Sequence, residues 1–235
     1  MVLGLVLLAA NYAGAQEEDE EDERPISGKA AVGYLATSGN TDSTNANASF
    51  ELLYERENWS HEFVMSAISA SNSGATTAEA YSFTYEARRD LGNSSYLFTM
   101  LDWERDEFSA FDHQLSEAAG YGRRLIATDR HALNAEVGAG LRQAETRLGL
   151  KEDEGILRAA LDYVWSVNDN TEFSQDLTLD KGSSNTRIQT LSELRARLFG
   201  NVALVLSYRI KSNSEVTPGI AKTDRFTAIS LEYAF

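Results

Sequence analysis

Three histidines are the side chains of this sequence best suited to acid–base or nucleophilic chemistry: His61, His113 and His131. A membrane-barrel hydrolase of the phospholipase kind needs a serine beside a histidine that a third polar group orients. Residues 113–116 read His-Gln-Leu-Ser, whereas such barrels carry the shorter His-x-Ser spacing. His61 and His131 fall in the apolar phase of their segments, as interfacial histidines do. We therefore predict that the protein is not an enzyme.

Composition excludes several other kinds of site. Zero cysteines rule out a disulfide framework and a thiolate metal centre, and no His/Asp/Glu group has the spacing of a transition-metal site. The run LKEDE, residues 150–154, is interpreted as a solvated charge run rather than a calcium loop. A formal net charge of -15 argues against nucleic acid, which needs a basic surface. We expect no cofactor and no nucleic-acid partner.

Charged residues recur in the middle of segments whose other phase is apolar. Such residues would face a polar lumen, and acidic residues along 162–180 would lie beside basic residues along 187–211. Two interpretations stay open: a pore with a transverse field, or a lumen plugged by its own salt bridges. The candidate lumen-lining residues are Glu51, Glu86, Asp102, Glu136, Arg158, Asp162, Asp176, Glu193, Arg195, Arg197 and Arg209.

The elements that carry these charges are strands. From residue 27 onward apolar and polar residues alternate in segments of about 10–14 residues, which is the strand signal. The tight connections follow the even-numbered segments, and longer ones, such as SNSGATT (71–77), tend to follow the odd-numbered ones. Ten or fourteen strands are the alternatives to twelve. The expected strands are 28–38, 43–56, 59–70, 78–90, 95–106, 112–125, 130–143, 154–167, 171–181, 186–199, 201–212 and 223–235.

Alternation alone fits both a soluble and a membrane barrel, which point their apolar phases in opposite directions. Segment length and the mid-strand charges favour the membrane form, since about 9–11 tilted residues cross a bilayer. The sequence thus predicts an all-β, transmembrane, antiparallel up-and-down β-barrel with periplasmic termini, in lipid contact, in the outer membrane of a Gram-negative bacterium. An interfacial girdle is expected from aromatic residues near the short turns: Tyr54, Trp59, Tyr96, Trp165, Phe173, Phe199 and Tyr233.

The two ends of the sequence differ from its middle. Residues 1–15 resemble a secretory signal, with an apolar run at 2–10 before Ala13-Gly14-Ala15, although no Lys or Arg precedes the run. Residues 16–26 hold the acidic run QEEDEEDER and predict a disordered linker. The barrel is expected over 27–235.

The final segment, RFTAISLEYAF, is fully patterned and ends on an aromatic residue. A closed barrel has no free edge, so its last strand can be a full member of the sheet. Alternating hydrophobic residues ending in Phe also resemble the signal that the outer-membrane assembly machinery recognises. Tyr233 and Phe235 are the candidate assembly residues.

Residues 28–59, GKAAVGYLATSGNTDSTNANASFELLYERENW, resemble the opening of the salt-induced outer-membrane proteins, the YdiY-like family. The segment Gly33-Tyr34 with Ser38-Gly39-Asn40-Thr41 carries the likeness, and 115–142 is similar to the middle of that family. The resemblance implies an outer-membrane barrel and a link to salt. We expect a narrow porin-like channel for small polar or ionic solutes, with a non-conducting structural or partner-binding barrel as the alternative.

Overall fold

A computed structural model describes residues 25–37, 43–107, 111–146, 149–216 and 219–235. The described residues contain no helix long and apolar enough to span a membrane. The expected signal segment (1–15) and most of the expected acidic linker (16–26) lie outside the described residues.

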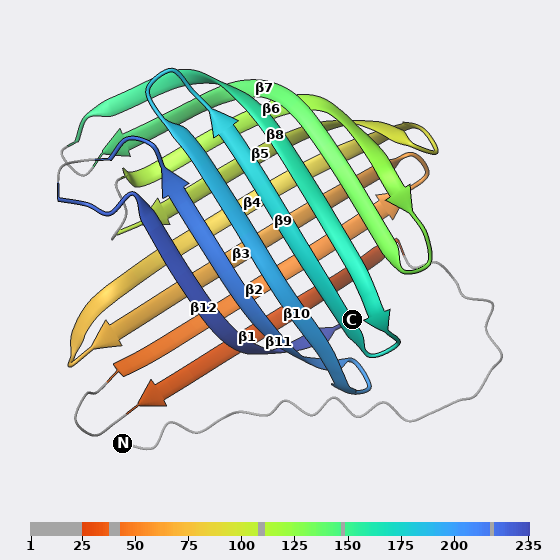
Figure 1. Ribbon diagram of the computed structural model, residues 1–235, viewed down its shortest axis with the longest axis horizontal. Helices are drawn as coiled ribbons and strands as arrows, with labels where there is room; N and C mark the ends of the chain where they lie inside the picture. The colour runs from red at the N-terminus through yellow and green to blue at the C-terminus, as the bar shows by residue number, and fades with distance from the viewer. Residues whose placement is uncertain (1–24, 38–42, 108–110, 147–148, 217–218) are drawn as a thin grey trace.

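Twelve antiparallel strands close into one barrel, as the alternation predicted (Figure 1). Each strand pairs with its sequence neighbours, and β1 pairs with β12. The strand bounds are β1 (Ile26–Thr37), β2 (Ser43–Arg56), β3 (Trp59–Asn72), β4 (Ala75–Gly92), β5 (Ser95–Asp106), β6 (Phe111–Ala127), β7 (His131–Thr146), β8 (Lys151–Asn168), β9 (Thr171–Lys181), β10 (Thr186–Phe199), β11 (Val202–Asn213) and β12 (Thr223–Ala234).

The last strand closes the sheet. Lys29 pairs with Ala234, and the amide of Gly28 donates to the Phe235 carbonyl at 3.0 Å while the Phe235 amide donates to the Gly28 carbonyl at 2.9 Å. The Phe235 ring stacks on Phe50 with centroids 6.3 Å apart. Closure leaves no free sheet edge, which is a condition for a β-structure in lipid.

The barrel is inside-out relative to a soluble protein. Large apolar side chains of one phase are exposed on the outer wall, including Val137 at 61% and Ile229 at 57%. Charged side chains of the other phase are buried inside, including Glu104 and Arg187. Only a hydrocarbon surround makes this arrangement favourable, because apolar surface in water is costly. The barrel is therefore a membrane barrel, in contact with outer-membrane lipid.

The connections follow the predicted asymmetry with one exception. The turns after β2, β4, β6, β8 and β10 are tight, and the longest connection, 214–222, follows β11 at the opposite end. The expected longer loop at 71–77 is wrong, because β3 and β4 continue to Asn72 and Ala75 around a two-residue turn. Its residues Ser73 and Gly74 have φ of 51° and 81°, as a tight hairpin turn requires.

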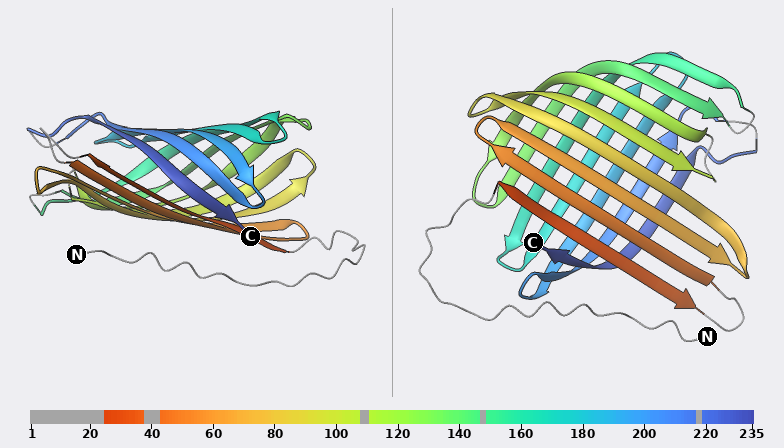
Figure 2. Two further views of the ribbon diagram at one scale, coloured as in Figure 1. Left: turned by 90° about the horizontal axis from the view of Figure 1, so that it is seen from below. Right: turned by 180° about the vertical axis from the view of Figure 1, so that it is seen from behind.

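The barrel is flattened. The strands β8–β12 form one wall and cross the strands of the opposite wall, β1–β5, at a steep angle (Figure 1). Seen along the walls, the two layers lie close together (Figure 2). Side chains from opposite walls can therefore meet inside the lumen.

Candidate functional site: the barrel lumen

One part of the lumen is filled by large side chains of β5. Tyr96, Phe98 and Met100 point inward and, with Ala118, form a buried cluster. Room for the rings comes from glycines on the neighbouring strands, since a Cβ on Gly122 would lie 2.2 Å from the Tyr96 ring. The expected place of Tyr96 in the outer girdle is therefore wrong: its side chain is only 1% exposed.

The guanidinium of Arg88 binds several acidic side chains beside this packed cluster. Arg88 of β4 forms ion pairs with Glu86, with Glu136 at 3.2 Å and with Asp162 at 3.6 Å. The Arg88 guanidinium also lies 5.1 Å from the centre of the Tyr96 ring, and the Tyr96 hydroxyl donates to Glu136 at 2.8 Å. Three carboxylates from three strands thus share one guanidinium, and this cluster links β4, β7 and β8 inside the lumen.

Ion pairs also cross the lumen from wall to wall. Glu104 of β5 binds Arg187 of β10 and accepts from Lys211 Nζ of β11 at 2.5 Å. A second Arg187 nitrogen lies 3.4 Å from Asp102 of β5. Such buried charges are tolerated because each has a partner. This cross-lumen bridge joins the two walls of the flattened barrel.

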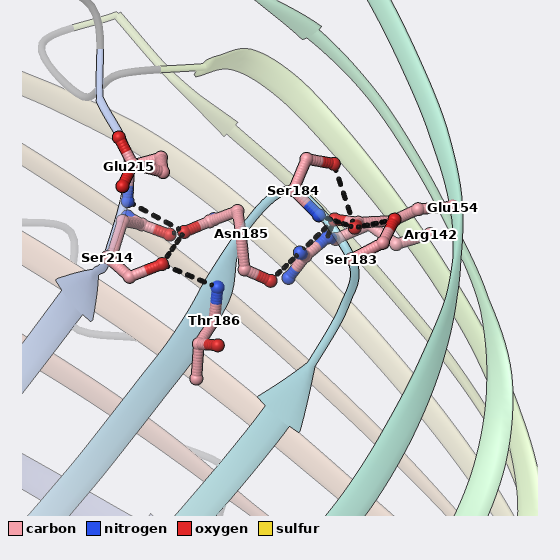
Figure 3. Close-up of polar contacts among 9 residues, drawn as sticks. Arg142, Glu154, Ser183, Ser184, Asn185, Thr186, Ser214 and Glu215 are labelled. Carbon is pink, nitrogen blue, oxygen red and sulfur yellow. Dashed lines mark hydrogen bonds and ion pairs between the residues drawn. The ribbon is translucent and has the colours of Figure 1, made fainter.

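At the end of the barrel that carries the long connections, a polar network holds the turn 182–185 in place (Figure 3). Arg142 pairs with Glu154 and donates to the Asn185 carbonyl at 2.6 Å. Glu154 accepts from the Ser184 amide at 2.8 Å, and the Asn185 side chain donates to Asn213 at 2.8 Å. The network ties β7, β8 and β11 to that turn.

The remaining part of the lumen, lined mainly by β9–β12 and β1–β3, is hollow. A cavity of about 690 Å³ lies at the tight-turn end, a central cavity of about 420 Å³ follows, and one of about 300 Å³ lies toward the other end. The first two share Lys29, Arg195 and Glu232 in their walls. The second and third share Asn47 and Phe226, among others. The three cavities therefore form a row along one side of the barrel.

The boundary between the first two cavities is charged. Arg195 lies 2.5 Å from Glu172 and 2.8 Å from Glu232, and Lys29 lies 3.0 Å from Glu51. These pairs come from adjacent or near-adjacent strands and run along the wall, not across the lumen. Their side chains take up space at the boundary between the two cavities, but the ion pairs do not connect opposite sides of the lumen.

The central cavity also carries charges that have no ion pair. Among the described residues, Glu62, Asp176 and Glu193 make no ion pair within 4 Å, and neither does Arg209. Three carboxylates facing one guanidinium leave this part of the lumen acidic. A small cation in the cavity would meet a favourable field.

The candidate residues predicted from the sequence all lie in the inward phase of their strands, but they have different surroundings in the structure. Glu86, Glu136 and Asp162 meet at Arg88, Asp102 joins the cross-lumen bridge, and Arg158 pairs with Asp180 at 3.0 Å. The others line the cavities: Glu51, Asp176, Glu193, Arg195 and Arg209 in the central one, and Arg197 in the first.

Several interior residues were not among those candidates. Arg88, Glu104 and Lys211 lie two residues from the candidates Glu86, Asp102 and Arg209, so extending each strand's alternation by one step would have found them. Within the described part of the chain, no group of three or more His, Asp or Glu side chains could hold a metal ion.

The comparisons with known proteins agree with this geometry. The family model described as "Protein of unknown function, DUF481" matches residues 30–235. The uncharacterized protein YdiY of Escherichia coli K12 is 27% identical over 213 residues, covering 90% of this chain and 84% of that protein.

Two solved structures are similar in fold at low identity. The translocator domain of the autotransporter NalP from Neisseria meningitidis has a TM-score of 0.51 at 12% identity, covering 92% of this chain and 90% of that one. An outer membrane channel from Pseudomonas putida F1 has a TM-score of 0.50 at 12% identity, covering 93% and 99%. Both likenesses concern the fold alone, which is that of outer-membrane barrels.

Proposed function

The chain belongs to the DUF481 family, and from that premise we propose that it is a narrow outer-membrane channel for small polar or ionic solutes. The observation that carries the proposal is the row of three cavities along one side of the lumen, joined by shared wall residues. The cavities extend from the tight-turn end of the barrel toward its other end, and the packed cluster around Tyr96 would keep the proposed path narrow.

The preferred solute is a cation. Glu62, Asp176 and Glu193 face the central cavity without an ion pair, while Arg209 is the corresponding unpaired cation among the described residues. A lumen lined by an excess of one sign concentrates counter-ions and lowers the barrier for their entry. The proposed channel therefore conducts small cations better than anions of the same size.

Planar-bilayer recording of the purified barrel tests the proposal. We expect stepwise conductance with a cation preference, and a stronger preference after Arg195→Gln, because Glu172 and Glu232 then lose their partner. Arg123→Gln, which removes an exposed charge from the outward phase of β6, is the matched control and should leave the preference unchanged. A silent bilayer after many confirmed insertions would overturn the proposal.

That silent outcome would favour the alternative, a non-conducting structural or partner-binding barrel. The cross-lumen bridge of Glu104 with Arg187 and Lys211 is the observation on its side, because such contacts obstruct part of the lumen. From the family resemblance we also propose a salt-related role, whether the barrel conducts or not. Growth of a deletion strain across a range of salt concentrations tests that role, and equal growth throughout would contradict it.

We also propose that the outer-membrane assembly machinery recognises the C-terminal strand through Tyr233 and Phe235. Both side chains face outward and are about half exposed, at 53% and 52%. Phe235→Ala should slow insertion while keeping the backbone bonds to Gly28. Phe50→Ala removes the same ring contact from the other side, so equal slowing by both variants would reduce Phe235 to ordinary packing.

A further inference from the structure

A hollow on the outside of the barrel has no part in the lumen. It lies at the β2–β3 turn, has a volume of about 390 Å³, and is lined by Tyr54, Arg56, Glu57, Trp59 and His61. The turn belongs to the tight-turn end of the barrel, which in outer-membrane barrels faces the periplasm. The hollow is therefore level with the periplasmic leaflet, which consists of glycerophospholipids.

Stacked rings hold the wall of this hollow rigid. The Trp59 and His61 rings are nearly parallel, with centroids 5.9 Å apart and an interplanar angle of 11°, and Tyr54 lies 6.0 Å from His61. A hydrogen bond of 2.9 Å between His61 Nδ1 and the Tyr85 hydroxyl fixes the imidazole. Such a wall presents flat apolar faces at the depth where lipid headgroups meet acyl chains.

Three charged side chains lie beside this wall. The Arg89 guanidinium lies 5.6 Å from the centre of the Trp59 ring, and Arg56 and Glu57 line the hollow itself. In the part of the chain that the structure describes, none of these three makes an ion pair. Two guanidinium groups next to one carboxylate match a ligand with a phosphate and an ammonium group.

A second ring cluster on the barrel shows that aromatic residues alone do not make this site. His131 stacks on Tyr163 and on Trp165, with centroids 6.0 Å apart in both cases, and bonds the Tyr163 hydroxyl at 2.8 Å. It repeats the rings and the hydrogen bond of the first cluster. Within the described ranges, however, no Arg or Lys stacks on the Trp165 ring.

We propose that the hollow at the β2–β3 turn binds the headgroup of a phosphatidylethanolamine molecule. Arg56 and Arg89 donate to the phosphate, Glu57 accepts from the ammonium group, and the stacked rings contact the glycerol and the upper acyl chain. The site faces lipid, so it does not depend on whether the lumen conducts. It would fix the height of the β2–β3 turn in the membrane.

Native mass spectrometry of the delipidated, detergent-solubilised barrel titrated with phosphatidylethanolamine tests this proposal. Arg56→Gln combined with Arg89→Gln should weaken binding about tenfold or more, because charge-assisted hydrogen bonds are lost. Trp165→Ala, at the second cluster, is the control and should bind as the wild type does. Equal binding by the double variant and the wild type would overturn the site.

The headgroup assignment has its own test, which needs no folding-sensitive variant. The wild type should prefer phosphatidylethanolamine over phosphatidylglycerol, which has the phosphate but no ammonium group, and Glu57→Gln should abolish that preference. Equal affinity of the wild type for both lipids would overturn the assignment. Heat-modifiable gel migration verifies that each variant is folded, and all three substituted side chains are exposed.

Discussion

Two halves of the barrel, one around β4–β8 and the other formed by β9–β12 with β1–β3, enclose the same lumen but fill it differently. The first places Tyr96, Phe98 and Met100 inside against glycines and binds three carboxylates to Arg88. The second lines the lumen with small and short polar residues, such as Ser207 and Ala228, and leaves cavities. The first half is filled mainly by packed rings and ion pairs, with a cavity of about 230 Å³ beside Met100 and Glu104, whereas the second half lines most of the volume of the three cavities in the row.

The difference teaches that closure of a barrel does not decide whether it conducts. Twelve strands enclose only a narrow lumen, and a few large side chains on one strand suffice to fill part of it. Where the inward phase is small, space remains along the barrel. The packed part then supplies stability, and the hollow part supplies the proposed path.

The largest expected effect is at the cross-lumen bridge. Glu104→Gln leaves the buried Lys211 without an ion pair and Arg187 with only the longer contact to Asp102 at 3.4 Å, so the free energy of unfolding should fall by about 3–5 kcal/mol. Glu51→Gln in the hollow half breaks a partly exposed pair with Lys29 and should cost less than about 1 kcal/mol. Urea titration of the barrel in lipid vesicles measures both, and equal losses would contradict the contrast.

The next largest loss of stability should distinguish the lipid-facing side of the barrel from its hollow lumen. Leu206→Arg puts a charge on the lipid face, where Leu206 is 45% exposed, and should destabilise by about 2–4 kcal/mol near the bilayer midplane. Leu191→Arg, on the wall of the central cavity, should change stability far less, because its guanidinium reaches Asp176 and Glu193. The same titration compares the variants, and a stable Leu206→Arg barrel would mean that the faces are inverted.

A smaller loss is expected where the packed half has no room. Gly122→Ala places a methyl group 2.2 Å from the Tyr96 ring, which Arg88 and Arg124 hold in place from 5.1 and 5.3 Å, so overpacking should cost about 1–3 kcal/mol. Ala228→Val adds methyl groups next to two cavities and should stay within about 0.5 kcal/mol. If both substitutions cost the same, the two halves are equally packed.

The smallest effect on stability should accompany a clear effect on transport. Ser207→Phe points a ring into the central cavity and should leave the free energy of unfolding within about 0.5 kcal/mol. Single-channel conductance should nevertheless fall, because the ring takes up space on the proposed path. Unchanged conductance in a variant that still conducts would place the path elsewhere in the barrel.

Much of the fold follows from alternation in the sequence. A period of two over segments long enough to cross a bilayer determines twelve strands, the faces on which their side chains lie and the tight turns at one end. Eleven charged residues could be assigned to the inward phase for the same reason. The exceptions are local: Ser73 and Gly74 adopt positive φ, so a segment that looked like a loop is a two-residue turn.

What the sequence could not determine is which inward side chains meet. Glu104 and Arg187 lie on strands five places apart in the sheet, and only the flattening of the closed barrel brings them together. Tyr96 stands beside a tight turn like the girdle aromatics, but the space above Gly122 on the next strand admits its ring to the interior. Alternation specifies a face within one strand, because it is a property of the local backbone. Contacts across the lumen, and therefore the division into a packed and a hollow half, depend on the shape of the whole barrel.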